Sequence, residues 1–100
     1  MTAEDRPHYV YVYRQERFNG KTYAKVGVSI NPEKRRFNAS GRYSNHSGYQ
    51  FHSKHLAASR EEAFRVEALV KRHFRDQSIH PELFMVQPEK VEALITESLS

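Results

Sequence analysis

The sequence predicts one α+β domain in which a small three-stranded antiparallel sheet is flanked by helices. Two stretches rich in β-branched and aromatic residues, 8–14 and 21–28, flank an Asn19-Gly20 pair, which is typical of a tight antiparallel hairpin. The second half of the chain instead carries apolar residues at helical spacing behind helix-start signals. One hundred residues suffice for one such domain with a modest core.

The first two strands each divide into an aliphatic face and a tyrosine-bearing face. In the first strand Tyr9, Tyr11 and Tyr13 alternate with Val10 and Val12. In the second strand Tyr23, Lys25 and Gly27 alternate with Ala24, Val26 and Val28. We expect the aliphatic face to pack under helices, and the other face to stay half polar because each phenol needs a partner for its hydroxyl.

The second strand leads into a basic segment. Asn31 followed by Pro32 predicts a helix start, because Asn caps free N–H groups and proline has none to satisfy. This helix should run to about Ser40 and carry Lys34, Arg35 and Arg36. A polar loop follows, and residues 49–56 then predict the third strand.

Two further helices complete the predicted domain. Ser59 and Glu62 form a capping-box pattern that opens a helix to about Arg75. Pro88 begins the last helix, and residues 83–86 between them predict a short strand or a docking turn. The apolar positions of the two helices are Ala63, Val66, Leu69, Val70, Phe74, Val91, Leu94 and Ile95.

Composition narrows the classes of function. Sixteen basic and twelve acidic residues give a net charge of +4, which permits nucleic-acid binding without requiring it. The absence of cysteine excludes disulfides, thiolate metal sites and thiol nucleophiles. No apolar run is long enough to span a membrane, and the first residues contain no apolar signal region, so we expect a cytoplasmic protein. Residues 1–7 are expected to form a disordered tail, and residues 8–98 the domain.

Glu67 and Arg35 stand out as candidate functional residues. Glu67 falls inside the apolar stripe of its helix, where a carboxylate needs a cation, hydrogen bonds or a metal to stay ionised. It is either a core-edge residue paired with an arginine or a metal ligand, since Mg²⁺ often takes only one or two protein carboxylates. Arg35 belongs either to a solvated basic run or to a phosphate-binding site.

The alternation of the third strand should place His52 and His55 on opposite faces, which argues against metal chelation by this pair.

The order and spacing of these residues resemble the small phage-type branch of the GIY-YIG nuclease superfamily over roughly residues 8–95. Tyr9-Val10-Tyr11 resembles the first motif, and Lys25-Val26-Gly27 resembles the second. Arg35 has the spacing of the family's catalytic arginine, Glu67 that of its metal-binding glutamate, and Glu82-Leu83-Phe84 resembles the closing pattern. Lys25 occupies the position of the second tyrosine, and Tyr23, on the same face, would stand in for it.

The resemblance implies a GIY-YIG-type endonuclease that hydrolyses DNA phosphodiester bonds. Glu67 would hold one Mg²⁺ or Mn²⁺, Arg35 would bind the scissile phosphate, and Gly27 would allow a close turn. Tyr11 or Lys25 would orient or deprotonate water with support from Tyr23. The candidates for contacts with the DNA backbone are Arg36, Arg42, Lys54 and Lys71.

A catalytically inactive GIY-YIG-like domain that binds DNA or a protein partner is the alternative. Lys25, in place of the second tyrosine, favours it. An active enzyme with one site per chain would cut both strands as a homodimer or by sequential nicks. Such a protein could be phage-encoded and act in the cytoplasm of the host.

Overall fold

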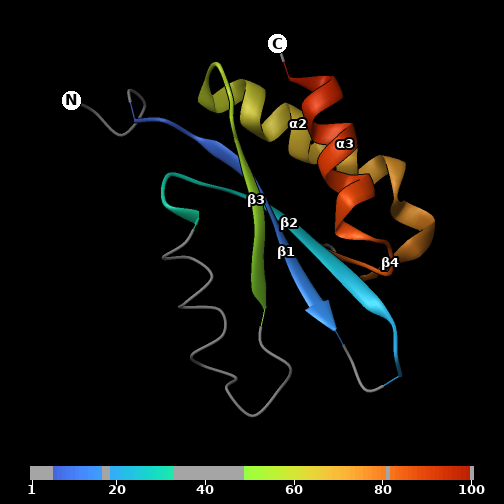
Figure 1. Ribbon diagram of the computed structural model, residues 1–100. Coiled ribbons are helices and arrows are strands. Elements are labelled where there is room, and N and C mark those ends of the chain that lie inside the picture. The colour runs from blue at the N-terminus through green and yellow to red at the C-terminus, as the bar shows by residue number, and fades with distance from the viewer. Residues whose placement is uncertain (1–5, 17–18, 33–48, 81, 100) are drawn as a thin grey trace.

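The computed structural model describes residues 6–16, 19–32, 49–80 and 82–99, and the predicted α+β class is confirmed. The strands are β1 (Tyr9–Glu16), β2 (Thr22–Ser29), β3 (Gln50–Leu56), β4 (Ser78–His80) and β5 (Leu83–Phe84). The helices are α2 (Arg60–His73), the short 3₁₀ helix η2 (Arg75–Gln77) and α3 (Pro88–Ser98). The strands form one sheet in the order β3-β1-β2-β5-β4, and every pair is antiparallel (Figure 1).

The prediction of three strands was wrong, because β4 and β5 extend the sheet beyond β2. β5 is the short strand that the sequence offered as one alternative over residues 83–86, whereas β4, with three residues, is too short for an alternating pattern to be visible. The predicted helix over residues 32–40 lies, apart from Pro32, outside the described residues.

The predicted hairpin between the first two strands is confirmed. β1 and β2 pair from Tyr9↔Ser29 to Glu16↔Thr22. Gly20 adopts a positive φ of 78°, a conformation that favours glycine, and the Asn19 Oδ1 accepts a hydrogen bond from the Lys21 amide at 2.9 Å.

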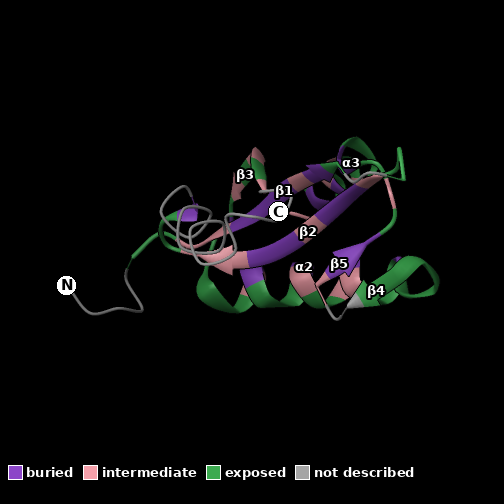
Figure 2. Ribbon diagram, turned by 90° about the horizontal axis from the view of Figure 1, so that it is seen from below, coloured by how far each residue is buried: buried purple, intermediate pink, exposed green. Residues whose placement is uncertain are grey.

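The aliphatic face of the sheet forms the core, as the alternation predicts. Val10, Val12, Ala24 and Val26 are fully buried and pack with apolar residues from both helices. α2 and α3 also contact each other, and β1, β2 and β5 are largely buried, whereas the outer surface of α2 is exposed (Figures 1 and 2). The helix residues in this core are Ala63, Val66, Val70, Val91 and Ile95.

The starts of both helices follow the predicted signals. The Ser59 hydroxyl accepts a hydrogen bond from the Glu62 amide at 3.1 Å, and the Glu62 carboxylate accepts one from the Ala58 amide at 3.2 Å. Pro88 occupies the first turn of α3.

The expectation that His52 and His55 lie on opposite faces of β3 was wrong. Tyr13 pairs with Phe51 and Val12 with Ser53, so His52 is an extra residue at a β-bulge. The bulge shifts the alternation by one position, and both histidines lie on the helix-covered face. His52 reaches Glu92 of α3 at 2.9 Å, while the His55 ring nitrogen lies 3.0 Å from the Ser53 hydroxyl.

Candidate functional site

Gly27 and Tyr11 are opposite each other in the β1–β2 ladder and in direct contact. A Cβ atom on Gly27 would lie 2.2 Å from the Tyr11 hydroxyl oxygen and 2.4 Å from its Cζ, so only glycine leaves room for this phenol. Tyr11 is 2% exposed, and its ring centroid lies 4.4 Å from that of the fully buried Tyr13. The close packing fixes the Tyr11 ring against the backbone of β2.

Tyr23 shares this face but belongs to the hairpin end of the strand. It pairs with Gln15, and its hydroxyl accepts a hydrogen bond from the Asn19 side-chain amide at 2.8 Å. Tyr23 is 3% exposed. The structure therefore places the two predicted catalytic tyrosines on one face, with Tyr11 against Gly27 and Tyr23 bonded to the turn.

Lys25 lies between them on β2, opposite Tyr13. Its side chain is 21% exposed, and its Nζ lies 5.2 Å from the ring centroid of Tyr49, within the range of a cation–π contact. The same Nζ lies 3.9 Å from a carboxylate oxygen of Glu82. Lys25 is thus held between an aromatic ring and a carboxylate.

Glu67 lies in the middle of α2, directly after the buried Val66, and its side chain is 14% exposed. Its partner among the described residues is Lys71, one turn along the helix, with 3.6 Å between Nζ and carboxylate oxygen. Lys71 also lies 3.7 Å from Glu82. The four charged residues therefore form a continuous row, Glu67–Lys71–Glu82–Lys25, which we call the charge row.

The pKa of Glu67 is raised above its usual range. Burial is the main cause, and the negative charge of Glu82 adds to it, while the charge of Lys71 and its hydrogen bond oppose it. The carboxylate thus keeps a proton to a higher pH than an exposed glutamate, and a nearby cation would favour its ionised form.

The shortness of β5 explains how side chains from two faces of the sheet meet. β5 pairs only with Ala24 and Lys25, and the Val26 amide then donates to the Glu82 carbonyl at 3.1 Å. In the described part of the chain, no strand pairs with the rest of β2 on this side. The charge row runs past this open edge, from α2 to the face that carries Lys25.

The donor set fits a hydrated Mg²⁺ better than a fully protein-coordinated metal. Within the described ranges there is no group of three or more His, Asp or Glu residues that could hold a metal ion. Mg²⁺ keeps several water ligands and can bind through one or two carboxylates, so Glu67 satisfies this requirement. Such an ion would compete with Lys71 for the carboxylate.

The predicted phosphate- and DNA-binding residues are placed only in part. Arg35, Arg36 and Arg42 lie outside the described residues. Lys54 is exposed on β3 and reaches over the ring of Tyr9, with its Nζ 4.9 Å from the centroid. Lys71 lies between two carboxylates rather than extending alone into solvent.

Sequence reasoning missed the role of Glu82 at the centre of the charge row. Its contacts join residues far apart in the chain, which no local pattern reveals. The expectation that an arginine pairs with Glu67 was wrong, because Lys71 has the i,i+4 spacing of a helical ion pair and takes that place.

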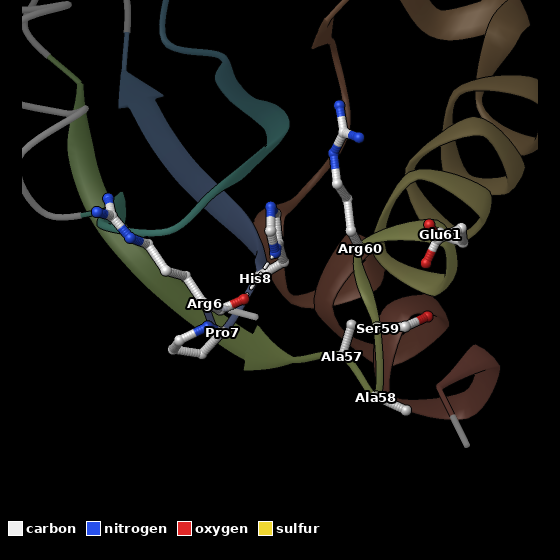
Figure 3. A pocket seen from close by; sticks show the side chains of 8 residues that line it. All are labelled: Arg6, Pro7, His8, Ala57, Ala58, Ser59, Arg60 and Glu61. Carbon is white, nitrogen blue, oxygen red and sulfur yellow. Dashed lines mark hydrogen bonds between the residues drawn. The ribbon is translucent and has the colours of Figure 1, made fainter. Parts of the chain in front are cut away.

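A separate hollow of about 440 Å³ lies at the start of α2 (Figure 3). Arg6, His8 and Arg60 contribute basic side chains to its lining, and Glu61 contributes an acidic one. The guanidinium groups of Arg6 and Arg60 extend away from each other (Figure 3), so the two arginines do not converge on one point.

None of the helices in the described ranges is long and apolar enough to cross a membrane. No curated protein matches the chain significantly, and no solved structure does. The sequence model of the T5orf172 domain matches residues 8–98. This match corrects the resemblance to the GIY-YIG superfamily, because the T5orf172 domain is a different family and no GIY-YIG family model matches. Since the match covers nearly the whole chain, the protein belongs to the T5orf172 domain family.

Proposed function

We propose that the protein is a metal-dependent endonuclease that hydrolyses DNA phosphodiester bonds. The observation that carries the proposal is the charge row, which links the half-buried Glu67 to Lys25 on the face of Tyr11. The site combines one carboxylate that could bind a metal ion with nearby ammonium and phenol groups. Metal-assisted hydrolysis of a phosphate diester uses groups of these types.

Each residue has a distinct role in this proposal. Glu67 would hold one Mg²⁺ or Mn²⁺, which supplies charge stabilisation for the phosphate and the leaving 3′ oxygen. Tyr11 or Lys25 would orient the attacking water, and only a Tyr11 phenolate or a neutral Lys25 amine would take up its proton; the ring of Tyr11 is fixed by Gly27. Arg35 would bind the scissile phosphate. Tyr23 would support the site from the hairpin end through its hydrogen bond to Asn19.

DNA would be held mainly through its backbone. Basic side chains form phosphate contacts that carry no sequence information, and such binding weakens as salt rises. Lys54 is the exposed candidate within the described residues, and Arg36 and Arg42 are further candidates.

We place this activity in the cytoplasm, which for a phage-encoded protein would be the cytoplasm of the host. Cleavage of both DNA strands would require a homodimer or two sequential nicks.

A DNA- or protein-binding domain without catalysis is the second candidate. Lys71 favours it, because its ammonium group already neutralises the Glu67 carboxylate on which a metal would have to bind. In this case the charge row would be a structural feature of the fold.

Plasmid cleavage in the presence of Mg²⁺, Mn²⁺ or EDTA separates the two candidates. The endonuclease requires metal-dependent nicking that falls by at least about a hundredfold in Glu67→Gln and Arg35→Ala. Glu61→Gln, which removes an exposed carboxylate from the first turn of the same helix, should cleave as the wild type does.

Direct titration with Mn²⁺ gives a second measurement that does not depend on cleavage. The wild-type protein and Glu61→Gln should bind the ion, and Glu67→Gln should not. DNA binding without cleavage of supercoiled, linear or branched DNA under any metal condition would establish the binding domain instead.

A further inference from the structure

Glu82 lies where three parts of the fold meet. Its carboxylate contacts Lys25 of β2 at 3.9 Å and Lys71 of α2 at 3.7 Å. Its main-chain carbonyl accepts the hydrogen bond from the Val26 amide, one residue before β5 begins. The backbone of Glu82 is therefore anchored to β2, and its side chain reaches both lysines of the charge row.

Among the described residues, each of the two lysines has one other partner. Lys71 contacts Glu67, and Lys25 lies over the ring of Tyr49. A lysine side chain is long and flexible, and one ion pair at a half-exposed position restrains it weakly. Two partners on different elements restrain the ammonium group more strongly, because each fixes a different direction.

We propose that Glu82 is a positioning residue that holds the ammonium group of Lys25 beside the tyrosine face and that of Lys71 beside Glu67. Glu82 acts through the two lysines and does not itself touch the DNA. What the positioned groups do rests on the proposed endonuclease function, whereas the positioning itself can be measured without any cleavage.

Three variants test the proposal. Glu82→Gln keeps the shape of the side chain and the main-chain hydrogen bond to Val26 but removes the charge. Glu82→Asp keeps the charge on a shorter side chain. Glu89→Gln is the matched control, since Glu89 is also a half-exposed carboxylate that pairs with one basic residue, Arg14, at 3.6 Å.

The first readout is the acylation rate of individual lysine amines at one fixed pH, followed by mass spectrometry. In Glu82→Gln, Lys25 and Lys71 should react about two- to fivefold faster than in the wild type, as expected for the loss of half-exposed ion pairs. Lys54, which is exposed in the wild type, serves as the internal reference. Glu89→Gln should leave both rates unchanged, and Glu82→Asp should recover part of the protection.

The second readout is the kinetics of DNA cleavage. Glu82→Gln should lower kcat about fivefold or more, because Lys25 is no longer held beside the tyrosine face. KM should stay unchanged or fall, because a negative charge near the DNA is removed. A merely structural role would instead lower the unfolding temperature and affect kcat in proportion to the fraction unfolded.

The two readouts separate failure of this inference from failure of the proposed function. Faster acylation in Glu82→Gln without cleavage by the wild type would support the positioning role and overturn the endonuclease. Unchanged acylation of Lys25 and Lys71 in folded Glu82→Gln would overturn the positioning role, whether or not the wild type cleaves DNA.

Discussion

Gly27 is the residue at which the tyrosine face of the sheet is most tightly constrained. A side chain at this position would overlap the Tyr11 phenol, whose ring is packed against Tyr13 and cannot turn away freely. The contact is set by a cross-strand pair, so it depends on the register of β1 and β2 as well as on the residue types.

Replacing Gly27 with alanine should therefore displace the Tyr11 ring. We expect Gly27→Ala to lose about 1–3 kcal/mol of stability, as is typical of an overpacked site, and to lose cleavage activity more than stability explains. Urea unfolding and cleavage assays at a temperature where the variant is folded would measure both. Ser59→Ala is the control, because it loses a helix cap of comparable stability at the start of α2 and should leave cleavage intact.

Glu67 should make the stability of the protein depend on pH in a defined direction. Its pKa in the folded protein is raised, mainly by burial, so the folded state holds this proton more tightly than the unfolded state does. The ionised carboxylate therefore costs stability at pH values above the raised pKa. This cost disappears as the pH falls through the raised pKa to below the usual value of 4.5.

Glu67→Gln should accordingly be more stable than the wild type at pH 7, by at most about 1 kcal/mol because the group is only partly buried. The difference should shrink to zero in acid, as measured by urea unfolding across the pH range. Glu61→Gln, which loses a favourable charge at the start of α2, should instead be slightly destabilised at pH 7. A loss of stability in Glu67→Gln at neutral pH would contradict the expectation.

At the scale of elements, the sequence predicted those that have a local signal. The β1–β2 hairpin follows from Asn19-Gly20, α2 from its capping box and α3 from Pro88. The bulge at His52 and the pairing of β4 with β5 carry no such signal, because they depend on contacts between residues far apart in the sequence. These are the places where the sheet differs from the prediction.

The cap of α2 offers a test of an element that the sequence predicted correctly. Ser59→Ala removes the hydroxyl that accepts the Glu62 amide and should cost about 1 kcal/mol. Ser59→Asp retains a cap acceptor and should stay near the wild type in a thermal melt. Equal stability of the alanine variant and the wild type would show that the cap contributes nothing measurable.

For the whole molecule, the basic charge is divided between internal pairs and exposed side chains. Lys25 and Lys71 contact carboxylates, whereas Lys54 lies on the surface of β3. Part of the basic charge is therefore held in ion pairs inside the fold, while Lys21, Lys54 and Lys90 are exposed lysines of the described part.

Measuring DNA affinity at several salt concentrations would show which of these lysines contacts the DNA backbone. Lys54→Ala should reduce the slope of log affinity against log salt by about one, as expected for one lost phosphate contact. Lys71→Ala should leave the slope nearly unchanged, because its charge is offset by Glu67 and Glu82. A matching decrease for Lys71→Ala would show that this lysine leaves the charge row to bind DNA.

The candidate site is the part that the sequence predicted least completely. The sequence showed Glu67 as a carboxylate in the apolar stripe of a helix. It also showed that Tyr11 and Lys25 lie on the same face of the predicted sheet. Their connection through Glu82 was not visible, because it depends on how β5 meets β2 and on how α2 lies under that edge.

The two-residue length of β5 also has a consequence for protein engineering. An extended β5 that paired with Gly27 and Val28 would add hydrogen bonds along the part of β2 that has no strand partner there among the described residues, and a paired sheet edge is less prone to aggregation. It would also run a backbone through the space that the charge row crosses. The fold thus offers a simple way to gain resistance to aggregation at the expense of the site, and a designer would have to choose between the two.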